Sequence, residues 1–266
     1  MTTLQKLEIK NHMISCNLQG GLGNQMFQIA AAISLAKSNN DIYSFNFENC
    51  FTPNQGNKST KYIDNIFKNI PSHTHNNFEK VYNEPKFSFS EIPYEKNLIL
   101  NGYFQSEKYF KNNSDYIKKI FYINDDNIKK ISNKYDTKNL TCVHIRRGDY
   151  LKFKDFHFTC DNDYYQKAIS LIDDTKFIFI SDDMDWVKIN FKSDNFLYSD
   201  LNDEILDFTL ITMCKNVIIS NSSFSWWGSY LNNNNGKIIA PKKWFGISGN
   251  KDTQDVIPNS WVLIDN

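Results

Sequence analysis

The residues with the clearest chemical potential lie between Cys142 and Tyr150, in the run Cys-Val-His-Ile-Arg-Arg-Gly-Asp-Tyr. Side chains alternate along a strand, so His144 and Arg146 project from one face while the valine and isoleucine between them pack on the other. A guanidinium offers a planar fork of donors that suits phosphate and stays charged. Because ligands of open α/β sheets bind beyond the carboxyl ends of strands, the run predicts an anion site. The alternative is a surface turn whose arginines only pair with Asp149.

A second run, Ser-Asn-Ser-Ser-Phe-Ser-Trp-Trp, covers residues 220–227 and links an expected strand to an expected helix. The hydroxyls and the N–H groups at the start of a helix form a seat for an anion. We therefore expect Ser220, Asn221, Ser222 and Ser223 to contribute to the same site. The competing interpretation is a serine cap followed by core tryptophans, and we expect both descriptions to hold.

Two adjacent carboxylates, Asp182 and Asp183, follow another expected strand. A carboxylate there can accept hydrogen bonds from the N1–H and N2–H₂ groups of guanine, or from a ribose. Capping of the next helix by the same aspartates is the alternative.

A glycine-rich turn, Gly-Gly-Leu-Gly-Asn-Gln, occupies residues 20–25. It is not a complete dinucleotide fingerprint, because the third glycine would fall at a methionine, and the chain has no phosphate-binding P-loop. Gly21 and Gly23 allow a ligand to approach the backbone near a helix N-terminus. The amides of Asn24 and Gln25 are good partners for sugar hydroxyls. A purely structural turn is the alternative.

Two Asp-x-Asp pairs, Asp161/Asp163 and Asp183/Asp185, have the spacing that holds a divalent metal on a sugar nucleotide. In a chain this rich in Asp and Asn such pairs are weak indicators. We therefore expect no metal site and no cofactor.

Composition limits the function classes. The 266 residues contain 30 basic and 30 acidic side chains, which argues against nucleic-acid binding, since that requires a basic face. No run is apolar enough to span a bilayer, and the first twelve residues lack the apolar region of a signal peptide. Five scattered cysteines form neither a disulfide framework nor a Cys-x-x-Cys site. We expect a cytoplasmic protein.

Strand patterns alternate with helix patterns, which indicates an α/β fold. The expected strands are 13–18, 42–47, 98–100, 140–145, 177–180, 217–219 and 237–240. The expected helices are 26–37, 62–69, 114–121, 125–134, 163–172, 184–190, 204–214 and 224–231, with a loop over 49–60 and an irregular stretch over 72–90. A boundary near residues 135–139 predicts domains 1–137 and 138–266. If the strands of the second domain are parallel, their polar ends collect on one edge, in a nucleotide-sized site.

The motifs together resemble the α-1,2-fucosyltransferases of glycosyltransferase family 11. The resemblance is carried by Gly-Gly-Leu-Gly-Asn-Gln-Met-Phe-Gln at 20–28, His-Ile-Arg-Arg-Gly-Asp-Tyr at 144–150 and Ser-Asn-Ser-Ser-Phe-Ser-Trp-Trp-Gly at 220–228. Asn-Gly-Tyr-Phe-Gln at 101–105 and Ile-Ala-Pro-Lys-Lys-Trp at 239–244 are also similar. The motifs follow the family order over nearly the whole chain.

The resemblance implies a GT-B-like fold, in which two Rossmann-like α/β domains face each other across a cleft. It implies inverting transfer of L-fucose from GDP-β-L-fucose to the 2-hydroxyl of a galactoside, with an α-1,2 linkage and no required metal. The partners are then GDP-fucose and a galactose-containing glycan, with no transmembrane segment and with peripheral membrane association as an option. In related fucosyltransferases the motif histidine meets the guanine and the first arginine meets the pyrophosphate.

The resemblance also assigns roles by position. The donor-binding residues are then His144, Arg146, Arg147, Asp182, Asp183, Ser220, Asn221, Ser222 and Ser223. The catalytic residues are Arg146, Asp149 and Asn24, with Gly21, Gly23 and Gln25 in the acceptor-side loop. The N-terminal domain is expected to bind mainly the acceptor, and the C-terminal domain the GDP-fucose.

The sequence leaves three points open. The base that takes the acceptor proton could be Asp149, Asp155 or His157, or no strong base is needed. A metal-dependent transferase using an Asp-x-Asp pair is one alternative function. A non-catalytic carbohydrate-binding protein with aromatic stacking is another.

Overall fold

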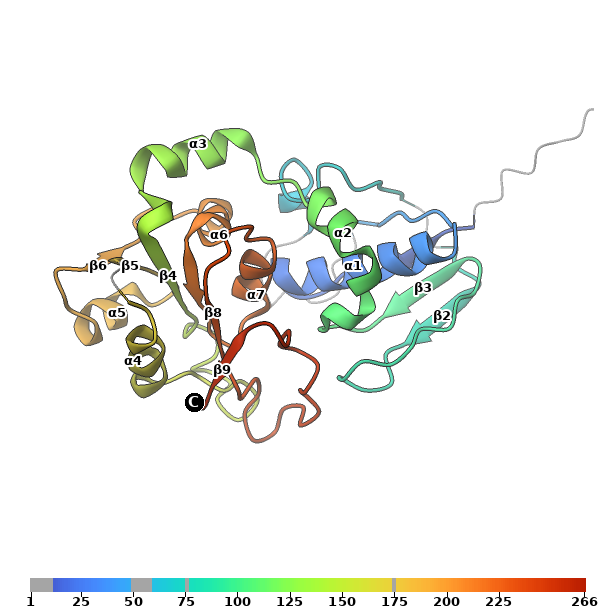
Figure 1. Cartoon of the computed structure of the whole chain (residues 1–266). Coiled ribbons are helices and arrows are strands. Elements are labelled where there is room, and N and C mark those ends of the chain that lie inside the picture. The colour runs from blue at the N-terminus through green and yellow to red at the C-terminus, as the bar shows by residue number, and fades with distance from the viewer. Residues whose placement is uncertain (1–11, 49–58, 75–76, 174–175) are drawn as a thin grey trace, which may run out of the picture.

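Two sheets, each parallel throughout, organise the chain (Figure 1). The computed structural model describes residues 12–48, 59–74, 77–173 and 176–266. The smaller sheet has the order β1-β3-β2, with β1 Ile14–Cys16, β2 Lys80–Asn83 and β3 Leu98–Asn101. The larger has the order β6-β5-β4-β7-β8-β9, with β4 Leu140–Ile145, β5 Lys176–Ser181, β6 Phe196–Tyr198, β7 Asn216–Ile218, β8 Ile238–Pro241 and β9 Val262–Ile264.

The α-helices lie between these strands and alternate with them one by one from β4 to β8. They are α1 Leu22–Ser38, α2 Ser114–Ile120, α3 Asp125–Lys134, α4 Asn162–Ser170, α5 Met184–Asn190, α6 Glu204–Met213 and α7 Ser223–Tyr230. Short 3₁₀ turns cover Ser59–Tyr62, Glu107–Tyr109, Lys111–Asn113 and Thr137–Asn139. Among the described residues, no helix is long and apolar enough to cross a membrane.

Strand β4 separates two groups of buried side chains, and the face that each side chain takes determines whether it can reach the site. Val143 and Ile145 pack with α4 and α5, whereas Cys142 packs on the opposite face with α6 and α7. Because side chains alternate, His144 shares the face of Cys142 and turns towards α7. The expected alternation along this strand is confirmed.

Helices α1 and α7 join the two halves of the molecule. The Phe27 ring of α1 lies 4.4 Å from the Trp226 ring and 5.1 Å from the Trp227 ring, centroid to centroid. Both tryptophans are fully buried, as expected for packing residues. One continuous core therefore crosses the expected boundary at 137/138.

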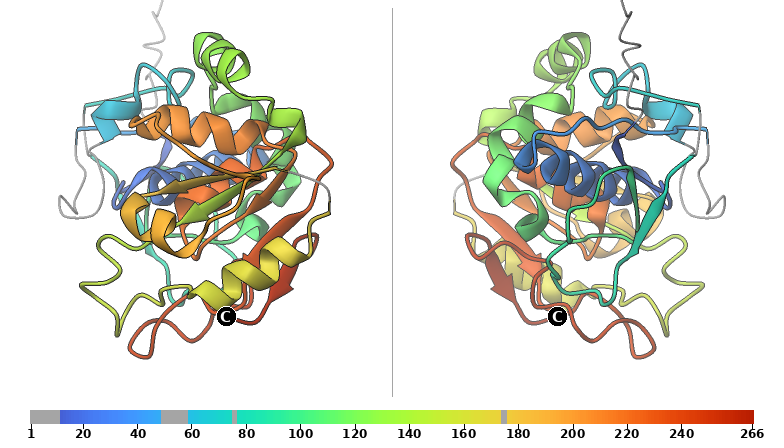
Figure 2. Two further views of the ribbon diagram at one scale, coloured as in Figure 1. Left: turned by 90° about the vertical axis from the view of Figure 1, so that its left-hand side faces the viewer. Right: turned by 90° about the vertical axis from the view of Figure 1, so that its right-hand side faces the viewer.

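Two loops of the C-terminal half, 146–161 and 242–261, lie on the same side of the molecule as the C-terminus (Figure 2). They are joined by backbone hydrogen bonds from Gly246 N to Phe156 O, 2.8 Å, and from Ser248 N to Asp155 O, 2.7 Å. These loops border the site described below.

The α/β class and the main elements agree with the sequence analysis, and β4, α3 and α5 have the expected bounds. Three expectations were wrong. Residues 42–47 form only single bridges at Tyr43 and Phe45, and 62–69 are turns after a 3₁₀ segment. The stretch 72–90 contains β2, an edge strand whose Val81 is exposed, so its pattern does not alternate. Strands β6 and β9, of three residues each, were not anticipated. Most of the expected 49–60 loop and residues 1–11 lie outside the described residues.

Candidate active site

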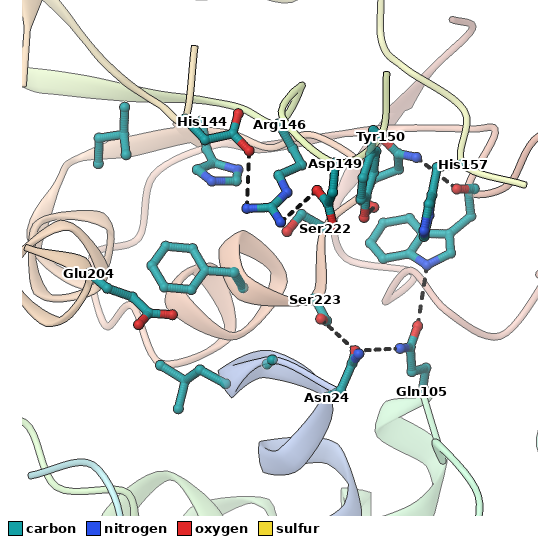
Figure 3. Close-up of a pocket in the computed structure, with 18 of the residues that line it drawn as sticks. Asn24, Gln105, His144, Arg146, Asp149, Tyr150, His157, Glu204, Ser222 and Ser223 are labelled. Atoms are coloured by element: carbon teal, nitrogen blue, oxygen red, sulfur yellow. Dashed lines mark hydrogen bonds and ion pairs between the residues drawn. The ribbon is translucent and has the colours of Figure 1, made fainter. Parts of the chain in front are cut away.

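A cavity of about 480 Å³ opens where α1 and α7 begin and where β4, β5 and β7 end (Figure 3). This volume is in the range of small-molecule sites. Its walls come from both halves of the chain, as the cleft expectation requires. Of the predicted site residues, Gly21, Gly23, Asn24, His144, Arg146, Asp149, Asp182, Asn221, Ser222 and Ser223 line it. Gln25, Arg147, Asp183 and Ser220 do not line it.

His144 is presented to the cavity as a neutral ring. Its Nδ1 lies 3.0 Å from the Ser220 hydroxyl oxygen, so Ser220 orients the imidazole from behind the cavity wall. Burial, with a smaller contribution from the Arg146 charge, lowers the pKa of His144 to about 3. At neutral pH the other ring nitrogen therefore acts as a hydrogen-bonding group without charge.

Arg146 is held by two carboxylates in the centre of the cavity. Its Nη2 lies 2.7 Å from Asp149 Oδ1 and its Nη1 lies 3.1 Å from Asp182 Oδ2. Asp182 Oδ1 also accepts the backbone N–H of Arg147, at 2.9 Å. The strand end and the next strand thus fix the plane of the fork, which is what bidentate recognition of phosphate requires.

Arg147 points away from the cavity and supports the strand end. Its Nε donates to Asp183 Oδ2 at 2.9 Å, and its guanidinium lies 3.9 Å from the centre of the Trp186 ring. Asp183 also caps α5 by accepting the Trp186 N–H. The capping alternative therefore describes Asp183, whereas Asp182 reaches the cavity.

The starts of α1 and α7 meet at the cavity. Gly21 and Ser222 are the N-cap residues, and neither caps its helix with a side chain. A Cβ on Gly23 would lie 2.2 Å from the Ser223 carbonyl carbon and 2.5 Å from the Phe224 nitrogen. Glycine is therefore required for the two helix starts to approach, and both dipoles direct their positive ends at one place.

Asn24 connects the two halves at this junction. Its Oδ1 accepts from the Ser223 hydroxyl at 2.7 Å and from Gln105 Nε2 at 2.8 Å (Figure 3). Gln105 Oε1 in turn accepts from Trp244 Nε1 at 3.3 Å. Gln25 Nε2 instead donates to Gly20 O at 2.8 Å and so stabilises the glycine turn.

Asn221 ties the loops around the cavity to the end of β7. Its amide nitrogen donates to Phe158 O at 2.6 Å and to Trp244 O at 2.8 Å. Its backbone oxygen accepts the Tyr150 hydroxyl at 3.0 Å. The side chain is thus occupied by loop anchoring.

Both Asp-x-Asp pairs begin helices. Asp161 caps α4 by accepting the Tyr164 N–H at 2.9 Å, and Asp183 caps α5. Within the described residues, no group of three or more His, Cys, Asp or Glu side chains is placed to hold a metal ion. The absence of a metal requirement stays a prediction.

The cavity also has an acidic end that the sequence did not predict, formed by Asn202, Asp203, Glu204 and Asp207 with Lys61. Glu204 pairs with Lys61 Nζ at 2.8 Å, and burial raises the pKa of Asp207 to about 6. Asp203 caps α6, so its sequence signal was that of an ordinary helix start. Only the fold brings α6 to the cavity.

The cavity also has an aromatic end, formed by Phe87, Tyr103, Phe156, Trp244 and Phe245, none of which the sequence singled out as a site residue. Of the open candidates for a base, Asp149 and His157 line the cavity, and Asp155 does not. Figure 3 places His157 and Glu204 at opposite sides, with Arg146 between them.

The fold is that of the GT-B glycosyltransferases. The solved structure of NodZ α-1,6-fucosyltransferase from Bradyrhizobium aligns with a TM-score of 0.50 and 13% identity, over 82% of this chain and 92% of that one. An arginine fork at a strand end, facing a second α/β unit, is the site expected for a nucleotide-sugar enzyme of this class. The chain belongs to glycosyl transferase family 11, whose sequence profile matches residues 1–265.

Relatives cover nearly the whole chain. The O-antigen biosynthesis glycosyltransferase WbnK of Escherichia coli is 32% identical over 94% of this chain and 99% of its own length. An α-1,2-colitosyltransferase of Escherichia coli is 30% identical over 95% of this chain and 99% of its own length. A galactoside 2-α-L-fucosyltransferase of Caenorhabditis elegans is 26% identical over 85% of this chain and 71% of its own length.

Proposed function

We propose that this chain transfers L-fucose from GDP-β-L-fucose to the 2-hydroxyl of a galactoside, with inversion and formation of an α-1,2 linkage. Family membership and the galactoside 2-α-L-fucosyltransferase among the relatives support the reaction. One observation carries the proposal. The Arg146 fork and the starts of α1 and α7 converge on one cavity that both halves of the chain line.

This convergence matches where charge develops. The bond between fucose C1 and the β-phosphate oxygen breaks, so negative charge grows on the departing GDP. Arg146 and the N–H groups at the two helix starts stabilise that charge, and Asn24 fixes the spacing between the helices. Each donor aimed at such a charge is worth about 10²–10³ in rate.

The donor contacts follow from the same geometry. We assign His144 and Asp182 to the guanosine end, and Arg146, Ser222 and Ser223 to the diphosphate. Three predicted donor residues act from behind the cavity wall. Ser220 holds His144, and the pair of Arg147 and Asp183 supports the end of β4. Asn221 anchors the loops, and Gly21 and Gly23 admit the phosphate to the backbone.

The direct test is transfer from GDP-fucose onto an array of β-galactosides, with the linkage of the product determined by NMR. Fucose on O2 with the α configuration is the expected product. The 30% identity to a colitosyltransferase makes GDP-colitose the donor to compare. Absence of transfer to every galactoside, or a preference for GDP-colitose, would overturn the proposed donor and acceptor pair.

The two alternatives have simple discriminators. We propose a reaction without a metal, because the cavity already contains a cation and two helix starts facing the diphosphate. Activity that is lost in EDTA and restored by Mn²⁺ would favour the metal-dependent transferase instead. Saturable GDP binding in calorimetry would count against a carbohydrate-binding protein without a donor site.

We further propose a cytoplasmic enzyme that acts at the membrane surface on a β-galactoside in a polysaccharide repeat or a host-like oligosaccharide. The O-antigen relative supports this setting. Cell fractionation before and after a high-salt wash tests it, because a peripheral protein is released by salt and a cytosolic one needs no wash.

A further inference from the structure

Five rings form an unbroken series along one end of the cavity. Centroid distances are 4.9 Å from Phe87 to Phe245, 5.4 Å from Phe245 to Phe156 and 4.9 Å from Phe156 to His157. His157 then stacks on Tyr150 at 4.1 Å, with 7° between the ring planes. All five side chains line the cavity. We call this series the aromatic wall.

The aromatic wall leads from solvent to the reacting centre. At its inner end the Arg146 guanidinium lies 5.6 Å from the centre of the Tyr150 ring. Its middle ring, Phe156, is 41% exposed, so the wall reaches solvent there. A backbone bridge between His157 and Phe245 fixes the two loops that carry most of the rings. The wall is therefore a built surface and not a set of separate exposed side chains.

The nucleotide is accommodated elsewhere. His144, assigned to the guanosine, lies 5.5 Å from the Phe224 ring, which packs on Phe208 at 5.4 Å. Figure 3 shows His144 and His157 on opposite sides of Arg146. A second substrate that meets the donor at Arg146 must approach along the aromatic wall.

We propose that the aromatic wall is the acceptor subsite, which stacks on the C–H face of a pyranoside, and that His157 takes the proton of the attacking hydroxyl. This inference rests on the proposed fucosyl transfer. A galactose ring carries its C–H bonds on one face and its hydroxyls at the rim, so it needs an apolar platform with polar groups at the edge. Gln105, Asn250 and His157 line the same cavity and supply polar groups.

His157 has the properties of the proton acceptor. Among the described residues its ring nitrogens have no hydrogen-bond partner. Burial is the largest influence on its pKa and lowers it, Asp149 raises it, and Arg146 lowers it. The ring is thus neutral at pH 7. Asp149, the other candidate in the cavity, is already paired with Arg146.

The step balances within the site. The acceptor O2 attacks fucose C1 as the bond from C1 to the β-phosphate oxygen breaks, and the electron pair of that bond leaves with GDP. The O2 proton moves to the unprotonated nitrogen of His157, which becomes an imidazolium and later releases the proton to solvent.

The first test compares Phe156→Ala with Phe153→Ala. Phe153 lies in the same loop, is 60% exposed and does not line the cavity, so it is the matched control. Loss of ring stacking should raise the acceptor KM about three- to tenfold, leaving the GDP dissociation constant unchanged. Phe156→Leu, which keeps apolar volume without a ring, should behave like Phe156→Ala. Equal acceptor KM in Phe156→Ala and wild type would overturn the subsite.

The second test is His157→Gln. We expect kcat to fall by about 10²-fold or more, with little change in GDP affinity. The acid limb of the wild-type pH–rate profile should lie below pH 6.5, the ordinary pKa of histidine, and should be absent from the variant. A kcat within threefold of wild type would overturn the role of His157. Failure of wild-type enzyme to fucosylate any galactoside would instead overturn the proposed function, so the two failures are distinct.

Discussion

The two ends of the cavity are built in different ways. At the end that we assign to the nucleotide, here called the nucleotide end, His144 and Asp182 stand directly at or after strand ends, and Phe224 belongs to the first turn of α7. At the end that we assign to the acceptor, here called the acceptor end, the aromatic wall comes from segments outside helices and strands, such as those carrying Phe87 and Phe156. Regular elements fix the first group within the fold, whereas loops carry the second.

This difference fits a division between a constant and a variable substrate. A nucleotide diphosphate presents the same charges in every reaction, so a rigid strand end and helix starts suit it. Acceptor glycans differ from enzyme to enzyme, and loops tolerate substitution and insertion better than strands do. We therefore expect relatives with other acceptors to differ first in the two loops 146–161 and 242–261.

The largest expected effect concerns Arg146, which lies between the two ends. Arg146→Ala should lower kcat by about 10²–10³-fold, because the developing charge on GDP loses its cationic donor. Arg146→Lys should not restore the rate, because an ammonium cannot replace a fork held by Asp149 and Asp182. Single-turnover rates at saturating donor are the measurement.

Arg147→Ala is the comparison variant, since this neighbouring arginine pairs with Asp183 outside the cavity. Its effect on kcat should be at least tenfold smaller than that of Arg146→Ala. Near-wild-type rates in Arg146→Lys would show that charge alone is sufficient and that the fork is not used.

The next effect in size concerns Gly23, where α1 and α7 touch. The new methyl of Gly23→Ala would lie 2.2–2.5 Å from backbone atoms of Ser223 and Phe224, so the helix starts must separate. We expect stability to fall by about 1–3 kcal/mol. Both GDP affinity and kcat should fall about tenfold, because the two ends of the cavity share this junction. Denaturant melts measure the loss of stability, and calorimetry measures the loss of GDP affinity.

Loss of only one of the two functions in Gly23→Ala would contradict the proposal that both ends of the cavity depend on this junction. If Gly23→Ala keeps wild-type GDP affinity and loses only acceptor turnover, then the start of α1 does not contribute to the diphosphate seat. A variant that is destabilised but fully active at low temperature would mean that the close approach serves folding alone.

Sequence patterns predicted the nucleotide end because its residues are local signals. His144 follows from strand alternation and Ser222 from a strand-to-helix junction, and each signal lies within its own run of nine residues, 142–150 and 220–228. The end that we assign to the acceptor was predicted only in part. His157 was named as a candidate base and the N-terminal half was expected to bind the acceptor, whereas four of the five rings of the aromatic wall belong to the C-terminal half. Phe156 and Phe245 are 89 positions apart in the chain and meet only through the bridge between their loops. Periodicity carries no information about such pairing.

The same reasoning explains the errors in the fold. β4 has six buried residues in a row and was located correctly, whereas β2 is exposed at three of its four positions. Its polar edge pattern is typical of a loop. Asp203 was overlooked because a helix cap and a cavity residue have the same sequence signal, and here one aspartate is both.

A smaller effect is expected on GDP affinity, and it should differ between variants in the two halves of the chain. His144→Ala should weaken GDP about tenfold, since a buried hydrogen-bonding group is lost from the guanosine end. Asn24→Ala should leave GDP affinity nearly unchanged and lower kcat, because Asn24 acts at the junction with Gln105. Titration calorimetry with GDP on both folded variants is the measurement. Equal losses in the two variants would mean that the Asn24 side chain itself contributes to donor binding.

The last prediction concerns stability and not turnover, through the support that Glu84 gives to the acceptor end. Its carboxylate accepts the backbone N–H groups of Tyr103 and Phe104, at 2.7 and 3.0 Å. It thereby holds Phe104 at a φ of 53°, an uncommon conformation for a bulky residue, and places the adjoining Gln105 against Asn24. Burial raises the pKa of Glu84 to about 7, although the two N–H donors lower it.

A raised carboxyl pKa reverses the usual dependence of stability on pH. Between pH 4.5 and about 7 the folded protein keeps a proton on Glu84 that the unfolded chain has lost, so stability falls as pH rises through this window. Relative to Glu84→Gln, the wild type should lose about 3 kcal/mol of unfolding free energy between pH 4.5 and 7, and no more above pH 7. Taking the difference from the variant removes the contributions of other groups, such as His144 and Asp207, which also titrate below pH 7. Urea melts of both proteins at half-unit pH steps provide the comparison, and a difference that stays constant from pH 4 to 8 would mean that Glu84 is ionised throughout and holds the Tyr103–Gln105 turn by charge.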